Sequence, residues 1–284
     1  MALLTADALL VRASRRLAEA GVRDPGLDAE RLLRHVLGWD RGTLVLRGHE
    51  LLPDDAAGRF ESLVAARARR RPLQHLTGVQ AFWKHDFEVS PDVLIPRPET
   101  ELLVETALAR LSGVAAPLVV DVGTGSGCIA VSLAAERADA EVHATDLSAA
   151  ALVVARRNAA RAGVAVRFHQ GDLLAPVAAL QGRVHLVACN PPYVGEVDEA
   201  TLAPEVRDHE PRLALFPPEG RQALYARLAR ESAVALRAGG ALVVEVGFGM
   251  ADEVAARLAA TGLVDVESRP DLAGIPRVVS ARRP

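Results

Sequence analysis

The sequence predicts an α/β protein in which helices cover both faces of a mainly parallel sheet, preceded by a small helical module. From about residue 99 onward, apolar runs such as "PLVVDV", "VHLVAC" and "ALVVEVG" alternate with segments of helical periodicity. Continuous apolar strands that alternate with helices are typical of parallel sheets buried on both faces. Before residue 76 the apolar positions repeat at helical spacing only.

The helical module covers residues 1–75. Thr5 can cap a first helix on which Leu9 and Leu17 share one face. An arginine-rich run, "RARRR" at residues 67–71, ends the last helix of the module. Two interpretations remain open for this run: a solvated helix end, or a surface for an acidic partner.

Two short aromatic and β-branched runs in "VQAFWKHDFEV" predict a hairpin, so we expect a linker at residues 76–98 and a larger domain at 99–284. The formal net charge of -3 argues against a dedicated nucleic-acid binder. The chain starts without the basic lead of a secretory signal, and no apolar run has the length of a membrane span, so we expect a cytoplasmic protein. The two cysteines, Cys128 and Cys189, have no metal-ligand spacing, and we expect free thiols and no metal site.

A glycine-rich loop joins the first strand of the larger domain to a helix. In "VVDVGTGSGCIAVSLA", Asp121 ends the strand, and Gly123, Gly125 and Gly127 form the turn. Glycines permit such a turn and let backbone amides approach a ligand at a helix N-terminus. Asp146 ends the second strand 23 positions after Gly123, close to the roughly 20 expected for a carboxylate that binds ribose hydroxyls. The loop therefore predicts a site for a nucleoside-like cofactor.

The spacing of the loop indicates which cofactor it binds. A dinucleotide fingerprint reads G-x-G-x-x-G and binds a pyrophosphate, whereas this loop reads D-x-G-x-G-x-G. The carboxylate of Asp121 would repel phosphate but suits an ammonium group, which favours S-adenosylmethionine (SAM). Asp172 in "QGDLL" follows the third strand and could accept a hydrogen bond from the adenine amino group, although a surface aspartate is the alternative.

The stretch "LVACNPPYVG" ends the fourth strand with two residues that cannot continue a ladder. Parallel strands place their carboxyl ends at one sheet edge, so Asn190 should reach the cofactor. The side-chain carbonyl of Asn190 and the backbone carbonyl of Pro191 offer two acceptors to a planar NH2 group, while Pro192 stiffens the turn and Tyr193 offers a flat face. A proline-stiffened turn without this role is the alternative.

Over nearly its whole length the chain resembles the class I SAM-dependent methyltransferases, and among them the HemK/PrmC release factor glutamine methyltransferases. The matching segments are "PLQHLTGVQAFW", "VSPDVLIPRPETE", "DVGTGSGCIAVSLA", "NPPYV", "EVRDHEPRLAL" and "EVGFG". The resemblance implies a Rossmann-like, mainly parallel seven-stranded sheet after a helical domain. It also implies methylation of the side-chain nitrogen (N5) of the glutamine in the Gly-Gly-Gln motif of class 1 peptide chain release factors, which act in translation termination. We expect a monomer, and we expect the helical domain to dock the substrate, because it contains no candidate chemistry but forms a separate surface with arginines at its end.

The resemblance assigns site residues by position. Those expected at the cofactor are Asp121, Gly123, Thr124, Gly125, Ser126, Gly127, Asp146, Asp172, Leu173 and Asn190. Those expected to hold the glutamine are Asn190, Pro191, Pro192 and Tyr193, of which Asn190, Pro191 and Tyr193 are the catalytic candidates. In "IPRPETE", the residues expected to close over the cofactor are Arg97, Glu99, Thr100 and Glu101. One departure from the family pattern is "LFPPEGRQAL", around Pro217 and Pro218.

Two rival functions remain at this stage. Enzymes that methylate adenine or cytosine amino groups in DNA or RNA share "NPPY", but the charge of -3 and the absence of a basic insert argue against DNA. A non-catalytic SAM-binding module is the second rival, and the intact Asp121, Asp146, Asn190 and Tyr193 argue against it. The acidic segment "EVRDHEP" is interpreted as a solvated loop or as a contact for a basic loop of the release factor.

Overall fold

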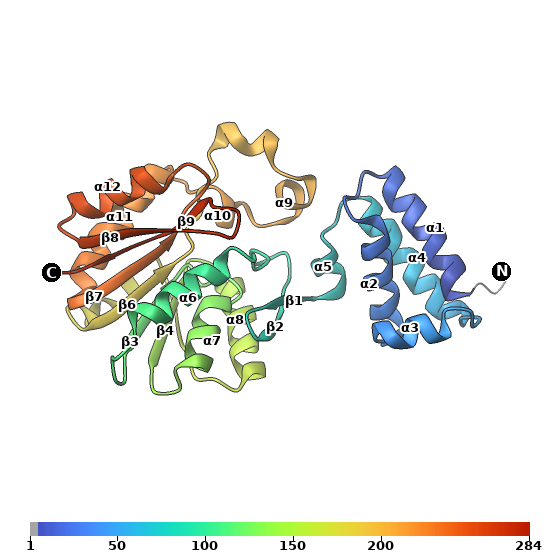
Figure 1. Cartoon of the computed structure of the whole chain (residues 1–284), viewed down its shortest axis with the longest axis horizontal. Coiled ribbons are helices and arrows are strands. Elements are labelled where there is room, and N and C mark those ends of the chain that lie inside the picture. The colour runs from blue at the N-terminus through green and yellow to red at the C-terminus, as the bar shows by residue number, and fades with distance from the viewer. Residues whose placement is uncertain (1–4) are drawn as a thin grey trace. The chain divides into compact units, whose positions relative to one another are not determined.

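The computed structural model describes residues 5–284 of the chain. The chain forms two compact units (Figure 1). The helical unit comprises Met1–Val79 together with Ala203–His209, and the sheet unit comprises Gln80–Leu202 together with Glu210–Pro284. No sequence pattern indicates that residues 203–209 belong with the helices. Within residues 5–284, no helix is both long and apolar enough to cross a membrane.

The helical unit packs around its own apolar core. Its helices are α1 (Ala6–Glu19), α2 (Pro25–Leu37), α3 (Arg41–Arg47), α4 (Asp54–Ala68), α5 (Leu73–Thr77) and α9 (Pro204–His209). Thr5 caps α1, as predicted: its side chain accepts a hydrogen bond from the amide of Ala8 at 3.2 Å. Leu9 and Leu17 are fully buried with Phe60. Amphipathic helices of this kind gain most of their stability from burial of the apolar face.

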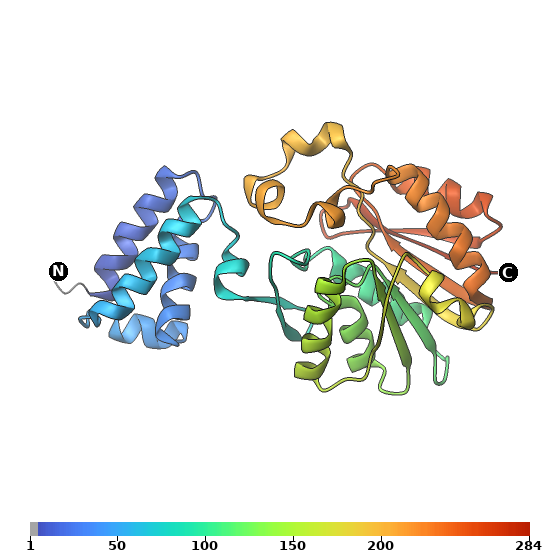
Figure 2. The same ribbon diagram turned by 180° about the vertical axis from the view of Figure 1, so that it is seen from behind.

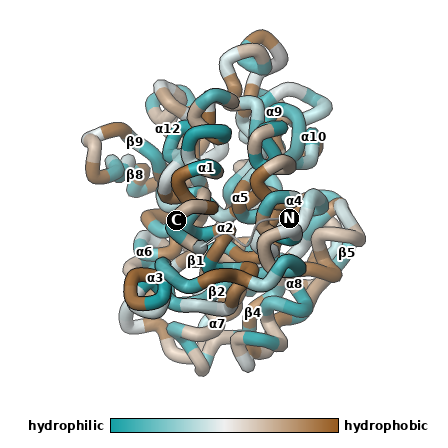
Figure 3. Tube along the Cα trace, turned by 90° about the vertical axis from the view of Figure 1, so that its right-hand side faces the viewer, coloured by the Kyte–Doolittle hydropathy of each residue, from teal (hydrophilic) through white to brown (hydrophobic). Residues whose placement is uncertain are grey.

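Apolar side chains also remain on the surface of the helical unit. Val45 and Leu46 of α3 are 77% and 75% exposed, and Val11 of α1 and Leu51 are exposed as well. The hydropathy colouring marks α3 as a hydrophobic stretch (Figure 3). Exposed apolar side chains that gather on one element are more typical of interaction surfaces than single scattered ones.

The arginine-rich run at the end of α4 is divided between side chains with partners inside the helical unit and exposed ones. Arg67 is buried, and its Nε donates to Asp28 Oδ2 at 2.7 Å and its Nη1 to Glu205 Oε1 at 2.9 Å. Arg70 Nη2 donates to Glu205 Oε2 at 2.7 Å. Glu205 comes from "EVRDHEP", so that segment is not a solvated loop at this residue either. Only Arg69 and Arg71 of the run stay exposed.

The sheet unit contains the mainly parallel seven-stranded sheet that the sequence predicts. Its strands are β3 (Leu118–Val122), β4 (Glu141–Asp146), β5 (Arg167–Gln170), β6 (Val184–Cys189), β7 (Leu236–Glu245), β8 (Val264–Pro270) and β9 (Pro276–Arg282). The order across the sheet is β5-β4-β3-β6-β7-β9-β8. The first five strands in this order run parallel, and β9 pairs antiparallel with both β7 and β8. The apolar patterns did not indicate β8, an edge strand without a buried residue.

Helices cover both faces of the sheet (Figures 1 and 2). The helices of this unit are α6 (Thr100–Arg110), α7 (Cys128–Glu136), α8 (Ala149–Ala162), α10 (Arg212–Leu215), α11 (Arg221–Ala235) and α12 (Ala251–Ala260), with 3-10 turns η1 (Ala175–Leu180) and η2 (Glu196–Thr201). One core joins α6, α7 and α8 to the sheet, and the other joins α11 and α12. Alternate strand residues enter the two cores, Val119 the first and Val120 the second, as burial on both faces requires.

The two aromatic runs form a hairpin of β1 (Val79–Phe82) and β2 (His85–Glu88). Phe82 and Phe87 are buried in the core of α6 and α7, with ring centroids 5.9 Å apart in an edge-to-face arrangement. The hairpin therefore anchors the start of the sheet unit to its core.

Candidate active site

The carboxyl ends of three neighbouring strands bring the predicted residues together. In the register of the sheet, Val122 of β3 pairs with Thr145 of β4 on one side and with Cys189 of β6 on the other. The chain order reverses at β3, and ligands of open α/β sheets bind at such a switch point. A cavity of about 190 Å³ lies there. Its lining includes Gly123, Gly125, Asp146, Asp172, Leu173, Asn190, Pro191 and Pro192.

The glycine loop depends on its glycines and on Asp146. Gly125 and Gly127 have φ angles of +54° and +83°, and a Cβ on Gly127 would lie 3.1 Å from the Cβ of Ala155. The amide of Gly125 donates to Asp146 Oδ2, and the amide of Ser148 to Asp146 Oδ1, both at 2.8 Å. The carboxylate expected at the ribose therefore also holds the loop in place.

Asp121 is a buried carboxylate with an unused acceptor. Its Oδ2 accepts from Thr124 Oγ1 at 2.6 Å and from the amide of Ala130 at 3.1 Å, whereas its Oδ1 has no hydrogen-bond partner. Burial raises the pKa of Asp121 to about 7, and the two hydrogen bonds oppose this shift. A buried carboxylate that lacks a partner fits a cationic ligand group, because the cation would restore the charged form.

The raised pKa of Asp121 predicts an unusual dependence of stability on pH. Since its pKa is about 7 in the folded state and near 3.9 in the unfolded state, the folded state retains a proton between these values that the unfolded state has lost. The free energy of unfolding therefore falls as pH rises through this window, by up to about 1.4 kcal/mol per pH unit from this group. We expect Asp121→Asn to lose this contribution. The free energy of unfolding of the variant should therefore rise relative to that of the wild type between pH 5 and 7, and the difference between the two should stay constant above pH 8.

Urea unfolding of both proteins at several pH values measures this difference. The matched control is Asp139→Asn, because hydrogen bonds from Arg137 and from the amide of Ala116 lower the pKa of Asp139 to about 2. Its difference from the wild type should not change between pH 5 and 8. Parallel curves for Asp121→Asn and the wild type across pH 5 to 7 would contradict the assignment.

The cavity wall around Asp172 holds an ion-pair cluster that no sequence pattern indicates. Asp172 pairs with Arg227 of α11, and Arg227 Nη2 contacts Asp172 Oδ1 at 3.1 Å and Glu219 Oε1 at 2.7 Å. The carboxylate expected at the adenine amino group is thus already charge-paired. Glu219, Arg227, Pro217 and Pro218 all line the cavity, so the departure from the family pattern falls on the cavity wall.

The "NPPY" segment follows β6 as its sequence predicts. Asn190 Nδ2 donates to Thr100 Oγ1 at 3.1 Å. Tyr193 packs against Gly247, where an added Cβ would lie 3.0 Å from Tyr193 Cδ2. Burial raises the pKa of Tyr193 to about 12, so its phenol stays neutral. Tyr193 is not among the residues that line the cavity, which leaves Asn190 and the prolines there.

The "IPRPETE" residues are divided among different contacts. Arg97 Nη2 donates to Glu210 Oε1 at 2.6 Å, and the same buried glutamate accepts from the amide of Ile95 at 3.3 Å. Glu101 accepts from the amide of Trp83 at 2.7 Å and so faces the hairpin. Thr100 contacts Asn190, as described above, and Glu99 is exposed. Glu210 belongs to the acidic segment "EVRDHEP", but no sequence pattern separates it from the other charged residues of that segment.

Cys128 and Cys189 are free, buried thiols, as expected. Burial raises the pKa of Cys128 to about 12 and that of Cys189 well above its usual value, so neither is a thiolate at neutral pH. Across residues 5–284, no three histidine, cysteine, aspartate or glutamate side chains are grouped to hold a metal ion.

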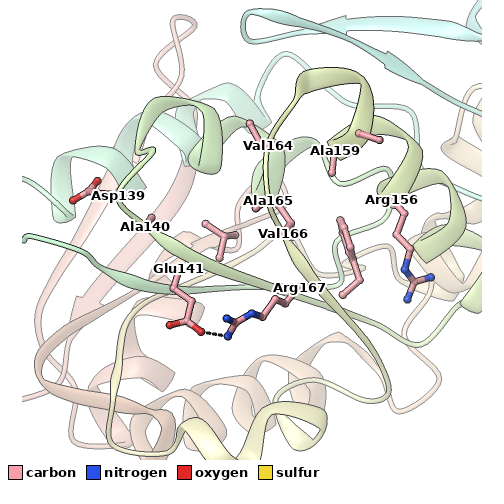
Figure 4. A pocket seen from close by; sticks show the side chains of 12 residues that line it. Asp139, Ala140, Glu141, Arg156, Ala159, Val164, Ala165, Val166 and Arg167 are labelled. Atoms are coloured by element: carbon pink, nitrogen blue, oxygen red, sulfur yellow. Dashed lines mark hydrogen bonds and ion pairs between the residues drawn. The ribbon is translucent and has the colours of Figure 1, made fainter.

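A larger hollow of about 650 Å³ contains none of the predicted residues (Figure 4). Its lining includes Glu141 and Arg167, the first residues of β4 and β5, and these two form an ion pair. It therefore lies at the amino ends of these strands, opposite the edge at which the glycine loop and Asn190 meet. The smaller cavity is the candidate active site.

Comparison with known proteins agrees with this geometry. Residues 8–78 match the family model of the PrmC N-terminal domain, and residues 98–206 match that of the methyltransferase small domain. The release factor glutamine methyltransferase of Cereibacter sphaeroides is 47% identical over 279 residues, 98% of each chain. That of Deinococcus radiodurans is 46% identical over 275 residues, 97% of each chain. The hMettl16 catalytic domain in complex with MAT2A 3′UTR hairpin 6 shares the fold, with a TM-score of 0.56, 15% identity, and 81% and 82% coverage.

The sheet order, the glycine loop at its switch point and the "NPPY" segment beside it define a class I methyltransferase domain. With relatives at this identity over nearly the whole length, the chain belongs to the release factor glutamine methyltransferase family.

Proposed function

We propose that this protein transfers a methyl group from SAM to the side-chain amide nitrogen (N5) of the glutamine in the Gly-Gly-Gln motif of peptide chain release factors. The observation that carries the proposal is the position of Asn190 and Pro191 in the lining of the cavity that also contains the glycine loop. Family membership supports the choice of a glutamine amide over a nucleobase as the acceptor.

The residues in and beside the cavity fit SAM. Asp121 is buried and does not itself line the cavity, but its neighbours Val122 and Gly123 do, and its unpartnered Oδ1 suits the ammonium group of the methionine part. Asp146 suits the ribose hydroxyls, while Asp172 and Leu173 line the place left for adenine. When bound, SAM supplies a methyl group on a sulfonium, which is a good leaving group. A dinucleotide fits poorly because Asp121 would repel its phosphates.

The protein's task is to orient a poor nucleophile. The lone pair of an amide nitrogen is delocalised into its carbonyl, so the nitrogen reacts only when it is held in the attacking geometry. Asn190 Oδ1 and the carbonyl of Pro191 accept the two N–H groups. Tyr193, expected from the sequence to offer a flat face to the amide, follows these residues but does not line the cavity, so the orientation of the amide is assigned to the two acceptors. No strong base is required, because the nitrogen becomes acidic as it is methylated and can release its proton late.

Labelled SAM tests the proposal directly. The protein is incubated in parallel with a release factor, with the same release factor carrying Gln→Glu in the Gly-Gly-Gln motif, and with duplex DNA. We expect one methyl group on the peptide that contains the motif, and no label on the Gln→Glu factor or on DNA. Label on DNA would favour the nucleic-acid methyltransferase, and SAM binding without transfer to any acceptor would favour a non-catalytic module.

A further inference from the structure

One residue of the cavity wall has a backbone conformation that its side chain disfavours. Leu173 lies in the turn after β5 and has a φ of +42°, in the left-handed region that a residue with a Cβ enters only at a cost in free energy. It lines the cavity and packs against the core of α11 and α12. Such strain persists only where neighbouring contacts impose it, and it is concentrated at sites that bind ligands.

The residues before and after Leu173 are both held by α11. Arg227 binds the carboxylate of Asp172 with two nitrogens, since Nη1 donates to Oδ2 and Nη2 donates to Oδ1 at 3.1 Å. The amide of Leu174, a buried residue, donates to Glu231 Oε2 at 3.1 Å. Arg227 and Glu231 are four positions apart on α11, so their side chains project from the same face of the helix. One helix thus fixes the chain on both sides of the strained residue.

The groups that this turn presents suit an aminopurine. The turn begins at Gly171, whose amide donates to the carbonyl of Asp146 at 2.9 Å. Each oxygen of the Asp172 carboxylate has about two lone-pair sites, of which Arg227 occupies one, so Asp172 can still accept from an amino group. Leu173 adds an apolar side chain beside this acceptor.

We propose that Arg227 and Glu231 are positioning residues that hold Asp172 and Leu173 in the conformation that receives the adenine of the cofactor. Glu231 gives the clearer test, because it is not among the residues that line the cavity. Without Glu231, Leu173 relaxes toward negative φ, and a bound cofactor must restore the strained form, which weakens its apparent affinity. This inference rests on the function proposed above.

Replacement of Glu231 tests this role through the affinity for S-adenosylhomocysteine, measured by calorimetric titration. We expect Glu231→Ala to raise the Kd by about 3- to 10-fold, the scale of one hydrogen bond, whereas Glu231→Gln keeps an acceptor and should stay within about twofold of the wild type. The KM for SAM should rise in Glu231→Ala, with kcat and the KM for release factor unchanged. The matched control is Arg230→Ala, at an exposed position of the same helix, which should keep the wild-type Kd.

Replacement of Leu173 shows whether Glu231 acts through the strained backbone. Asparagine adopts the left-handed region more readily than leucine, so Glu231→Ala should raise the Kd by less than about twofold in a Leu173→Asn background. Methionine keeps an apolar side chain without this tolerance, so the loss in a Leu173→Met background should equal that in the wild type. Each double variant is compared with its own Leu173 variant, so the direct effect of the changed side chain cancels.

S-inosylhomocysteine, which has a carbonyl group in place of the adenine amino group, tests the role of Arg227. The wild type should bind S-adenosylhomocysteine about 10-fold more tightly than this analogue, because Asp172 accepts from an amino group but opposes a carbonyl oxygen. In Arg227→Ala the carboxylate of Asp172 is free to turn away, so the preference should fall to about threefold or less.

The outcomes that would overturn the inference are distinct for the two residues. For Glu231 they are a wild-type Kd in Glu231→Ala, or equal losses in the Leu173→Asn and Leu173→Met backgrounds. For Arg227 the contrary outcome is an unchanged preference for S-adenosylhomocysteine in Arg227→Ala. A wild-type protein that binds S-adenosylhomocysteine but transfers no methyl group to release factor would overturn the proposed function alone.

Discussion

Asn190→Ala is expected to reduce kcat for release factor methylation by about 100- to 1000-fold, the cost typical of removing one group that stabilises the transition state. Asn190 supplies an acceptor whose effect is largest when the amide nitrogen attacks, so its loss lowers turnover more than ground-state binding. The glycine loop and Asp146 keep their mutual hydrogen bonds in this variant, since none of them involves Asn190. We therefore expect SAM to bind with nearly the same affinity.

Calorimetric titration with SAM, together with kcat from transfer of labelled methyl groups, measures the two effects separately. The contrasting variant is Asp146→Ala, which should weaken SAM binding by about 1 to 3 kcal/mol through lost charge-assisted hydrogen bonds. The loop amides that Asp146 holds add to that loss. Turnover by Asn190→Ala at the wild-type rate would mean that the clamp is misassigned.

The parts of the site that could be predicted from the sequence are those in which the signal is local. The glycine loop lies between a buried strand and a helix, so strand, turn and helix start are read from one contiguous stretch. The same holds for β6 and the two prolines that end it. Asp146 could be added because the spacing between the two strands is characteristic of ribose-binding sites.

The side chains that contact the predicted site residues could not be predicted themselves, because the two members of each contact lie far apart in the chain. Asn190 contacts Thr100 across 90 positions, and Arg227 contacts Asp172 across 55. Such pairs depend on which helix packs over which strand end, and no local pattern encodes this.

Charge runs misled the sequence interpretation for a related reason. Five residues of "RARRR" suggest a solvated or partner-binding face, yet Arg67 and Arg70 both pair with Glu205, 138 and 135 positions away. Any acidic side chain of the protein is a possible partner for a run of arginines, so the run alone does not indicate which one it pairs with. Only the fold selects among them, and here it selects an acid from the loop that follows the "NPPY" segment.

Removal of the helical unit is expected to separate substrate docking from cofactor binding. The sheet unit has its own apolar cores on the two faces of the sheet, and Val122 and Cys189 of the cavity wall belong to one of them, so a chain that starts at Val79 should retain its affinity for SAM. The helical unit holds no candidate chemistry but exposes Val45 and Leu46, which suits contact with a protein. We expect kcat/KM for intact release factor to fall by about 100-fold or more, the scale of losing one of two linked contacts.

Two controls make this truncation interpretable. The truncated chain loses Arg67 and Arg70, which leaves Glu205 without its partners and could loosen the loop after "NPPY". Glu205→Gln in the full chain weakens the same ion pairs while keeping the helices, and it should retain most of the activity if docking is what the truncation removes. A short peptide that contains Gly-Gly-Gln should be methylated equally slowly by both chains, because it is too small to use a second docking surface. If the truncated chain methylated intact release factor as fast as the full chain, the helical unit would have no part in docking. If Glu205→Gln lost as much activity as the truncation, the role of the helical unit would be to anchor the loop after "NPPY" instead.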